Sequence, residues 1–490
     1  MIREEIIKEI VEKGILLDSE VIDLVPDNLG SIFLDFLCER VNNKFLSKND
    51  FHYILNEYNK RFVFNTDFNV ELVHIYNDNF KKKEVQDFVK YFRNRYESIK
   101  NILIKRIELQ SVISVIRLRD KREGDRVSLI GLVLEKSITK SGNCILRLED
   151  TTGIIDVLIG KNKENLVEIV DEIVLDEILG VVGVLGKNIV FCNEIIFPDI
   201  PLNKELKRCD DEIYAAFIGD IHYGLNQFLE EEFSNFIDWI NSDYGEQKEI
   251  ASRLRYLFIV GDLVEGIGVY PGQEDDLKIK DIVKQYEGIS LLLSRINSNV
   301  KIIICGGNHD AMRIAEPQPL FDKKICECLY KLDNVYLVTN PSLVNIHKIN
   351  GFLGFDVLIY HGYSFIYYSD AVNSIRMKGG QERSDLVMRL LLKKRHLAPA
   401  HGSNLYIPDN RYDPLVIDKI PDFFISGHIH RIMVDNYKNV SLFNCSCWTT
   451  QTKDMEKRGI VPHPAKVPVV NLKTRDVRII NFLDSGVKNV

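Results

Sequence analysis

Residues 302–310 read Ile-Ile-Ile-Cys-Gly-Gly-Asn-His-Asp, an apolar run that ends abruptly in glycines and polar side chains. Four other stretches have the same form: Ala215–Ile218 before Gly219-Asp220, Leu257–Val260 before Gly261-Asp262, Val357–Tyr360 before His361-Gly362, and Phe423–Ile425 before Gly427-His428-Ile429-His430. Continuous apolar strands are typical of a sheet that is buried on both faces. Functional residues at the carboxyl ends of such strands line one crevice. From about residue 210 to the end, the pattern therefore predicts an α/β domain with one polar site.

The polar segments that follow the five strands carry carboxylates, imidazoles and one amide. Hard oxygen ligands combined with imidazoles suit Mn²⁺, Fe or Zn²⁺, and they can admit Mg²⁺. A carboxylate between two cations can bridge them, and such a pair activates water and stabilises both the attacking and the leaving oxygen of an in-line displacement. Glycines beside the ligands let the backbone turn sharply and leave room for a phosphate. The segments together predict a two-metal phosphoesterase site.

In this order, the five motifs resemble those of the calcineurin-like metallophosphoesterase superfamily, and the resemblance covers residues from about 211 to 480. It implies an α/β, or α+β, β-sandwich flanked by helices. It also implies roles for eight residues: Asp220, His222 and His430 would bind the first metal, Asp262 would bridge both, Asn308, His361 and His428 would bind the second, and His309 would protonate the leaving oxygen. An isolated Asp-x-His or His-x-His is more often a surface or core feature, but here each presumed ligand lies in its expected motif.

Upstream of this domain, residues 106–205 contain short strand-like segments separated by Gly and Asn turns: Arg126–Glu135, Ile145–Glu149, Ile154–Ile159, Ile178–Leu185 and Asn188–Glu194. This pattern predicts a small OB-like β-barrel. The groove of such a barrel commonly binds single-stranded nucleic acid, and the same fold also serves as a docking platform. Few aromatic residues interrupt these strands, so protein docking is supported at least as well as DNA binding.

The first part of the chain is predicted to be a helical module over residues 1–65, because apolar residues such as Ile10 and Leu37 recur at helical spacing. Residues 66–105 are polar and include the basic run Lys81–Lys83, so they predict a linker with some helix. The expected multidomain order is therefore a helical module, a linker, an OB-fold domain over 106–205 and a phosphoesterase domain over 206–490.

A barrel directly before a calcineurin-like domain resembles the small subunits of archaeal family-D DNA polymerases and the B-subunits of eukaryotic replicative polymerases. The stretches Gly307–Pro319 and Lys394–Pro399 are similar to segments beside the active-site motifs of the archaeal subunits. The eukaryotic subunits have lost metal ligands and act as scaffolds, whereas this chain keeps the whole set. The resemblance therefore implies a proofreading 3′–5′ exonuclease that acts on DNA and scaffolds a large catalytic polymerase subunit, with a sliding clamp as a further candidate partner.

Arg313, Arg395 and His396 lie in those two stretches and are candidate phosphate or substrate contacts, because arginine suits bidentate phosphate binding. For each of them, a salt bridge that holds a loop is an equal alternative. His401-Gly402 and the segment Gln451–Arg458 depart from the family's pattern, so the loops around them are not inferred from it.

The chain has 490 residues and a formal net charge of −8. An acidic total argues against a surface that tracks phosphates throughout, so contacts with nucleic acid must be local or assisted by a partner. Residues Met1 to Lys13 lack the apolar core of a signal peptide, and no apolar run reaches the length of about 18 residues that spans a membrane. We therefore expect a cytoplasmic protein without membrane contact, whose nine scattered cysteines are mostly reduced core thiols.

Three other functions stay open: a break-repair nuclease of the same superfamily, a non-catalytic polymerase scaffold, and a phosphatase or cyclic-nucleotide phosphodiesterase. Break-repair nucleases usually begin with the phosphoesterase domain, intact ligands speak against a vestigial site, and a simple phosphatase leaves the barrel without a purpose. Two divalent ions are the expected cofactors, with Mn²⁺ favoured over Mg²⁺, Fe or Zn²⁺.

Overall fold

The computed structural model describes residues 3–22, 24–25, 37–38, 40–41, 45–54, 68–77, 81–242, 247–349 and 351–483. In the N-terminal part, helices α1 (Arg3–Glu12) and α2 (Ser19–Ile22) accompany two short parallel strands, β1 (Leu16–Leu17) and β2 (Phe45–Leu46). Their buried apolar side chains, such as those of Ile10, Val21, Leu46 and Phe51, form a core of their own. The predicted helical module therefore also contains a strand pair.

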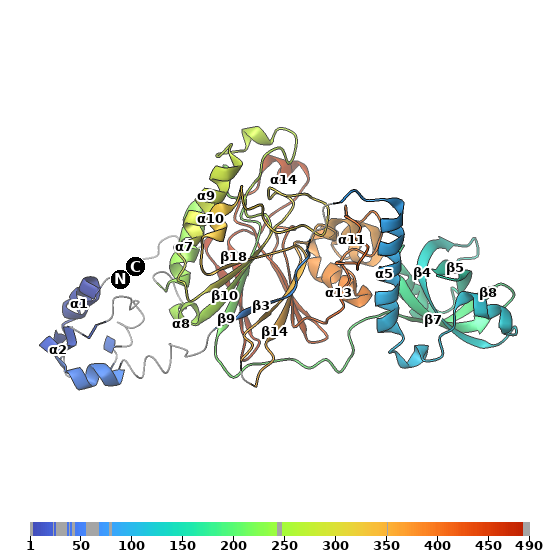
Figure 1. The fold of residues 1–490 in the computed structure, drawn as a ribbon, viewed down its shortest axis with the longest axis horizontal. Coiled ribbons are helices and arrows are strands. Elements are labelled where there is room, and N and C mark those ends of the chain that lie inside the picture. The colour runs from blue at the N-terminus through green and yellow to red at the C-terminus, as the bar shows by residue number, and fades with distance from the viewer. Residues whose placement is uncertain are drawn as a thin grey trace.

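The centre of the molecule consists of two six-stranded sheets packed face to face (Figure 1). The first sheet has the order β12 (Val335–Val338), β11 (Lys301–Cys305), β10 (Leu254–Val260), β9 (Tyr214–Ile218), β18 (Lys466–Asn471), β19 (Val477–Asn481). The second has the order β16 (Met433–Tyr437), β17 (Val440–Asn444), β15 (Phe423–Ser426), β14 (Phe355–Ile359), β13 (Ser342–Ile346), β3 (Val70–His74). Strands β9 to β12 run parallel, as do β14, β15 and β17.

Helices cover the outer faces of both sheets, which gives four layers (Figure 1). The first sheet packs against α7 (Glu230–Ile240), α8 (Lys248–Ser252), α9 (Ile282–Leu293) and α10 (Glu327–Tyr330), and the second against α11 (Phe365–Ala371), α12 (Asn373–Arg376) and α13 (Ser384–Lys394). Along β9, Ala215 and Phe217 contact the core between the sheets, while Ala216 and Ile218 contact the core beneath the helices. The inner strands are predominantly apolar, as expected of strands whose two faces are both buried, whereas the edge strands β3, β16 and β19 carry polar residues. The predicted β-sandwich flanked by helices is confirmed.

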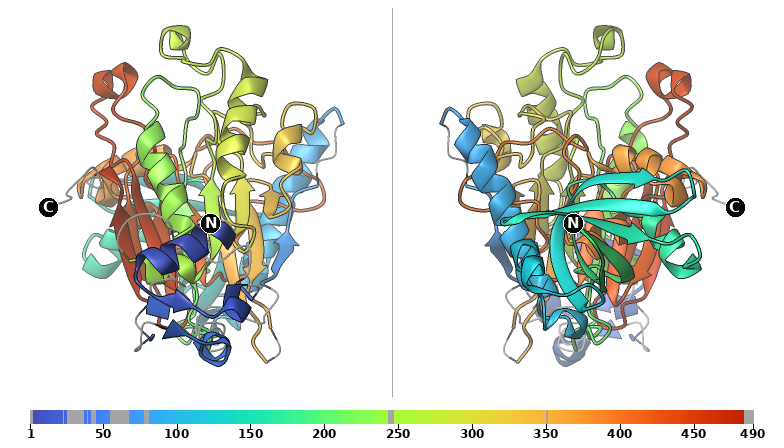
Figure 2. Two further views of the ribbon diagram at one scale, coloured as in Figure 1. Left: turned by 90° about the vertical axis from the view of Figure 1, so that its left-hand side faces the viewer. Right: turned by 90° about the vertical axis from the view of Figure 1, so that its right-hand side faces the viewer.

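Residues 126–196 form a closed five-stranded barrel, seen end-on in Figure 2. Its strands follow the order β4 (Arg126–Ile138), β5 (Cys144–Asp150), β6 (Gly153–Ile159), β8 (Ile189–Ile196), β7 (Ile178–Leu185), and α6 (Glu164–Asp171) connects β6 to β7. The short 3₁₀ helices η1 (Ile107–Leu109) and η2 (Val115–Asp120) precede it. Leu129, Leu146, Val157 and Val190 are among its fully buried core residues.

The prediction of a linker over residues 66–105 was wrong, because this segment is part of both folded domains. β3 pairs with β13 at the edge of the second sheet, and α5 (Val85–Leu103) runs alongside the barrel (Figure 2). Tyr96, Ile99 and Leu103 of α5 pack on the barrel strands. The inner face of α5 also buries Arg95, so its sequence looks polar although the helix is a core element.

Among the described residues, no helix combines the length and apolar character needed to cross a bilayer.

A buried ion pair fastens α5 to the phosphoesterase domain. Arg95 Nε lies 2.6 Å from Asp413 Oδ2, and neither side chain is more than 2% exposed. Replacing Arg95 by Met should lower stability by about 3–5 kcal/mol, because the buried Asp413 carboxylate loses its guanidinium partner and retains hydrogen bonds from His396 and the Leu415 N–H. Thermal and urea unfolding would measure this loss. Arg147→Met is the matched control: Arg147 pairs with Glu135 and Asp156 at 44% exposure, so its loss should change little. Equal effects of the two substitutions would contradict the role of Arg95.

Candidate metal centre

The eight residues predicted from the motifs all lie just beyond the carboxyl ends of five neighbouring strands. The strands and their residues are β9 with Asp220 and His222, β10 with Asp262, β11 with Asn308 and His309, β14 with His361, and β15 with His428 and His430. Because β9, β10 and β11 lie in one sheet while β14 and β15 lie in the other, the site joins the two sheets at one end of the sandwich.

Five of these residues have a left-handed backbone that non-glycine residues rarely adopt. The φ angles are 49° for Asp220, 52° for His222, 49° for Asp262, 70° for His428 and 57° for His430. Each such conformation costs about 1–3 kcal/mol and persists only where the surrounding structure enforces it. Strain repeated over one site is typical of a functional centre, since it turns the side chains toward a shared point.

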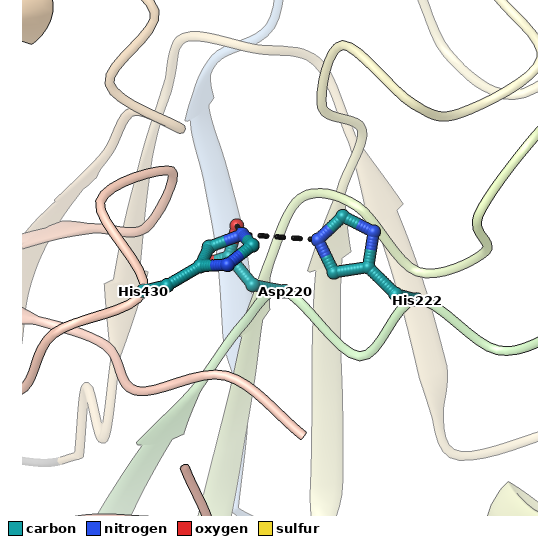
Figure 3. A group of neighbouring side chains, drawn as sticks. All are labelled: Asp220, His222 and His430. Carbon is teal, nitrogen blue, oxygen red and sulfur yellow. Dashed lines mark hydrogen bonds and ion pairs between the residues drawn. The ribbon is translucent and has the colours of Figure 1, made fainter. Parts of the chain in front are cut away.

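Asp220, His222 and His430 form the first group of metal-binding atoms, which all lie within 4.8 Å of one another. Figure 3 shows the two imidazole rings turned toward each other, with the Asp220 carboxylate beside His430. Nε2 of His222 is 3.1 Å from Nε2 of His430, and Asp220 Oδ1 is 3.4 Å from the same His430 atom. Two ring nitrogens at this distance must share either a proton or a cation, so the group fits a metal ion.

Asp262, His361 and His428 form the second group, again with ligand atoms within 4.8 Å. Asn308 Oδ1 lies 3.0 Å from His361 Nε2, which adds a fourth ligand to this group. His428 Nε2 is buried and has no hydrogen-bond partner among the described residues. Buried polar atoms are normally satisfied, so this nitrogen fits a metal ligand. Burial, together with the positive charge of His361, lowers the pKa of His428 to about 3 and keeps its ring neutral, as coordination requires.

Asp262 lies between the two groups. Its Oδ2 is 3.2 Å from His361 Nε2 and 3.9 Å from His222 Nε2, while Oδ1 accepts a hydrogen bond from the backbone N–H of His309 at 2.7 Å. Burial raises the pKa of Asp262, but His361 and His309 outweigh it and hold that pKa well below the usual range. Burial likewise lowers the pKa of His361, and Asp262 outweighs this and raises it to about 10. The carboxylate is therefore ionised and placed to bridge.

His309 lies outside the groups that contain Asp220 or Asp262, and its ring forms a third group with His222 and Glu265, whose ligand atoms also lie within 4.8 Å of one another. Its Nδ1–H donates to the Glu265 carbonyl oxygen at 3.0 Å, which leaves Nε2 on the other side of the ring. The side chain is 18% exposed and lines a cavity of about 730 Å³ that opens beside the metal-binding atoms. Burial lowers the pKa of His309, but Asp262 and Glu265 raise it to about 9. His309 can thus reach a bound substrate with a proton.

Glu265 is a functional residue that the sequence motifs did not reveal. Its Oε2 accepts from His222 Nδ1 at 2.8 Å, and its Oε1 accepts from Gln273 Nε2 at 2.8 Å. This carboxylate fixes the His222 ring so that Nε2 faces His430. The only signal in the sequence is its spacing of three residues after Asp262, and acidic residues occur too commonly in such loops for that spacing to single it out.

Asp310 is the last residue of the motif after β11, and the sequence predicts no role for it. In the structure it holds the loop after β11 in place. Its Oδ2 accepts from the backbone N–H groups of Gly307 and Leu263, and its Oδ1 accepts from the Tyr286 hydroxyl at 3.0 Å. The close approach of this loop requires glycine, because a Cβ at Gly307 would meet the Asp262 carboxylate. The space beside the glycine, which the sequence predicted for a phosphate, is therefore occupied by a ligand side chain.

The three candidate substrate contacts lie elsewhere, and none is among the described residues that line the cavity. Arg395 is 3% exposed and donates to the carbonyl oxygens of Ile417 and Asp418. His396 is 2% exposed and lies 2.9 Å from Asp413. Arg313 donates to the carbonyls of residues 315 and 317 in its own loop. These contacts fit the alternative role of holding loops.

Residues 214–431 match the calcineurin-like phosphoesterase family. The chain thus contains a calcineurin-like phosphoesterase domain, a type of domain that uses divalent metal ions.

Similarity to known proteins shows to which family this phosphoesterase-domain chain belongs. The chain is 40% identical over 408 residues to the DNA polymerase II small subunit of Methanothermobacter thermautotrophicus, covering 83% of this chain and 82% of the relative. The DNA polymerase II small subunit of Methanocaldococcus jannaschii is 40% identical over 392 residues, with 79% and 64% covered. That of Archaeoglobus fulgidus is 39% identical over 388 residues, with 79% and 75% covered. The chain belongs to this family, the small subunits of archaeal family-D DNA polymerase.

Substitution of Glu265 tests its role behind the first metal group. Glu265→Gln should weaken Mn²⁺ binding about 10–100-fold, because the His222 ring loses the carboxylate that orients it and raises its basicity. Isothermal titration with Mn²⁺ measures the change. Glu230→Gln serves as the control, since Glu230 is an exposed carboxylate of α7 that pairs with Lys278, away from the metal-binding groups. If Glu265→Gln bound Mn²⁺ as tightly as the wild-type protein, Glu265 would not orient His222 for metal binding.

Proposed function

We propose that this chain is a metal-dependent 3′–5′ exonuclease that proofreads for a replicative family-D DNA polymerase. One observation supports the proposal: seven candidate ligands lie in two groups, with Asp262 within 4 Å of an imidazole of each, in a chain of a polymerase small-subunit family. A vestigial site in a pure scaffold would not retain five strained backbone positions and an unpartnered buried imidazole. These features favour the enzyme over the scaffold.

Two divalent ions, Mn²⁺ favoured, would supply an activated water and neutralise the charge of the transition state when bound. Asp220, His222 and His430 would hold one ion, and Asn308, His361 and His428 the other, with Asp262 shared. Water attacks the phosphorus of the terminal nucleotide, and the bond from phosphorus to the preceding 3′-oxygen breaks. His309, held by the Glu265 carbonyl, gives the departing 3′-oxygen its proton. A nucleoside 5′-monophosphate is released.

The partners follow from the family. Relatives named as small subunits imply a large catalytic subunit, which this chain would scaffold while it trims DNA. We assign the barrel to the OB-fold because its five strands close in the order β4-β5-β6-β8-β7 with α6 between β6 and β7. It would supply a docking surface for the large subunit or a groove for single-stranded DNA. The sliding clamp and the cytoplasmic location stay predictions.

A break-repair nuclease remains the second candidate, since it would use the same metal centre. The similarity to polymerase subunits extends over about 80% of the chain and so beyond the phosphoesterase domain, which favours the replicative role.

Digestion of labelled DNA tests the function. With Mn²⁺, the protein should shorten a single strand and a mismatched primer stepwise from the 3′-end. Asp262→Ala should abolish this activity because both metal positions lose a ligand. His309→Ala should slow it about 10²–10⁴-fold, the usual contribution of a general acid, while both metals stay bound. His74→Ala, an exposed histidine on β3 outside the cavity, is the control.

Either of two results would contradict the proposal. One is an absence of digestion by protein that contains two metals and its large subunit, which would leave a scaffold. The other is full activity in His309→Ala, which would remove the acid from the mechanism.

A further inference from the structure

The cavity beside the metal groups extends past the ligands to two tyrosines that the mechanism does not use. Tyr363 lies in the turn after His361-Gly362, and Tyr367 lies four residues further on, in α11. The Tyr363 ring centroid is 5.6 Å from that of His428, so the ring stands directly beside the second metal group. Tyr367 is 38% exposed, so part of its ring is open to the cavity that it lines.

The opposite side of α11 is packed into the core, which holds Tyr363 and Tyr367 in place. We call these two side chains the tyrosine wall of the cavity. Phe365 and Tyr368 are fully buried against the second sheet. The Tyr368 hydroxyl donates to Ser403 Oγ at 3.0 Å and accepts from the backbone N–H of Ala400 at 2.9 Å. Tyr367 packs edge-on against Tyr368, with ring centroids 5.1 Å apart. A surface that is already ordered loses little entropy when a ligand stacks on it.

Two arginines line the same cavity. Arg431 is held in place by Glu382 at 3.1 Å and by the Val461 carbonyl at 3.2 Å. Arg458 directly follows α14 (Lys453–Lys457), is 54% exposed, and lies 3.4 Å from Asp454, one turn earlier in the helix. Both guanidinium groups are paired with carboxylates that line the same cavity, and Arg458, whose side chain is the more exposed, is the one placed to contact a phosphate.

We propose that Tyr363 and Tyr367 stack on the unpaired base of a DNA 3′-terminal nucleotide, while Arg458 contacts its phosphate backbone. The inference rests on the proposed exonuclease function and names the form of DNA that the site accepts. Every base has a π-face, so stacking is tolerant of sequence, as a proofreading site must be. A base that is still paired must first leave the duplex to reach the wall, and a mismatched base leaves more readily. The tyrosines would thus select for an unpaired end rather than for a particular nucleotide.

Oligonucleotides with and without a terminal base provide the test. Two single strands are compared, one ending in adenosine and one ending in a stable abasic residue, and kcat and KM are measured for the first cleavage with Mn²⁺. The wild-type protein should prefer the adenosine end by about tenfold or more in kcat/KM. Tyr363→Ala and Tyr367→Ala should bring this ratio close to one, mainly by raising KM for the adenosine end.

Conservative and matched variants separate stacking from misfolding. Tyr363→Phe and Tyr367→Phe should keep the wild-type ratio, because the ring is retained. Arg458→Gln should raise KM for both ends alike, since both carry phosphates. Tyr53→Ala removes an exposed tyrosine of the N-terminal module and should change neither constant. Metal content and thermal midpoints of all variants report whether they fold, and the exposed position of Tyr367 keeps the test available if Tyr363→Ala is unstable.

The failure of the inference differs from the failure of the proposed function. If the wild-type protein digests DNA and both alanine variants keep the wild-type preference for a base, the stacking role of the tyrosine wall is wrong and the exonuclease stands. If the wild-type protein hydrolyses bis(p-nitrophenyl) phosphate but releases no nucleotide from any DNA end, the exonuclease is wrong and the inference fails with it.

Discussion

The Asp262 carboxylate is the group on which the arrangement of the site depends. It lies within 4 Å of an imidazole from each metal-binding group, and its other oxygen accepts the backbone N–H of His309. A buried carboxylate surrounded by imidazoles is unfavourable without compensating charge, because burial penalises the ionised form. Positive charge, from protons or from metal ions, must therefore accompany it. Two divalent cations would satisfy both the carboxylate and the buried His428 nitrogen.

The two-sheet sandwich holds these groups in place. Its inner strands are apolar on both faces, and the polar residues that follow β9, β10, β11, β14 and β15 converge at one edge of the sandwich. The left-handed turns after β9, β10 and β15 bring carboxylates and imidazoles over that edge. Helix α5 and the pair Arg95–Asp413 then join the barrel to this body. A site built on strand ends of a packed core keeps its geometry when domains at the periphery bind partners.

Much of the fold and of the candidate site could be predicted from the sequence. Each candidate ligand closely follows an apolar strand and has a glycine near it in the sequence. The residues that could not be predicted act through contacts between distant segments. Glu265 is recognised only by its hydrogen bond to His222, and α5 only by the partners of its buried Arg95. Arg395 and His396 are plausible phosphate contacts by residue type. Their burial against Ile417 and Asp413 instead favours the alternative role of holding loops. The residue type shows which interactions a side chain can make, whereas its position in the fold shows which groups it contacts.

Electron paramagnetic resonance of the protein titrated with Mn²⁺ tests the central claim, a pair of ions joined by Asp262, most directly. Bridged ions in such two-metal sites lie about 3.5–4 Å apart and interact magnetically. We expect two equivalents to bind and the spectrum to show a spin-coupled pair that Asp262→Asn converts into isolated ions. Binding of a single equivalent, or of two ions without coupling in the wild-type protein, would contradict a shared carboxylate and with it the two-metal mechanism.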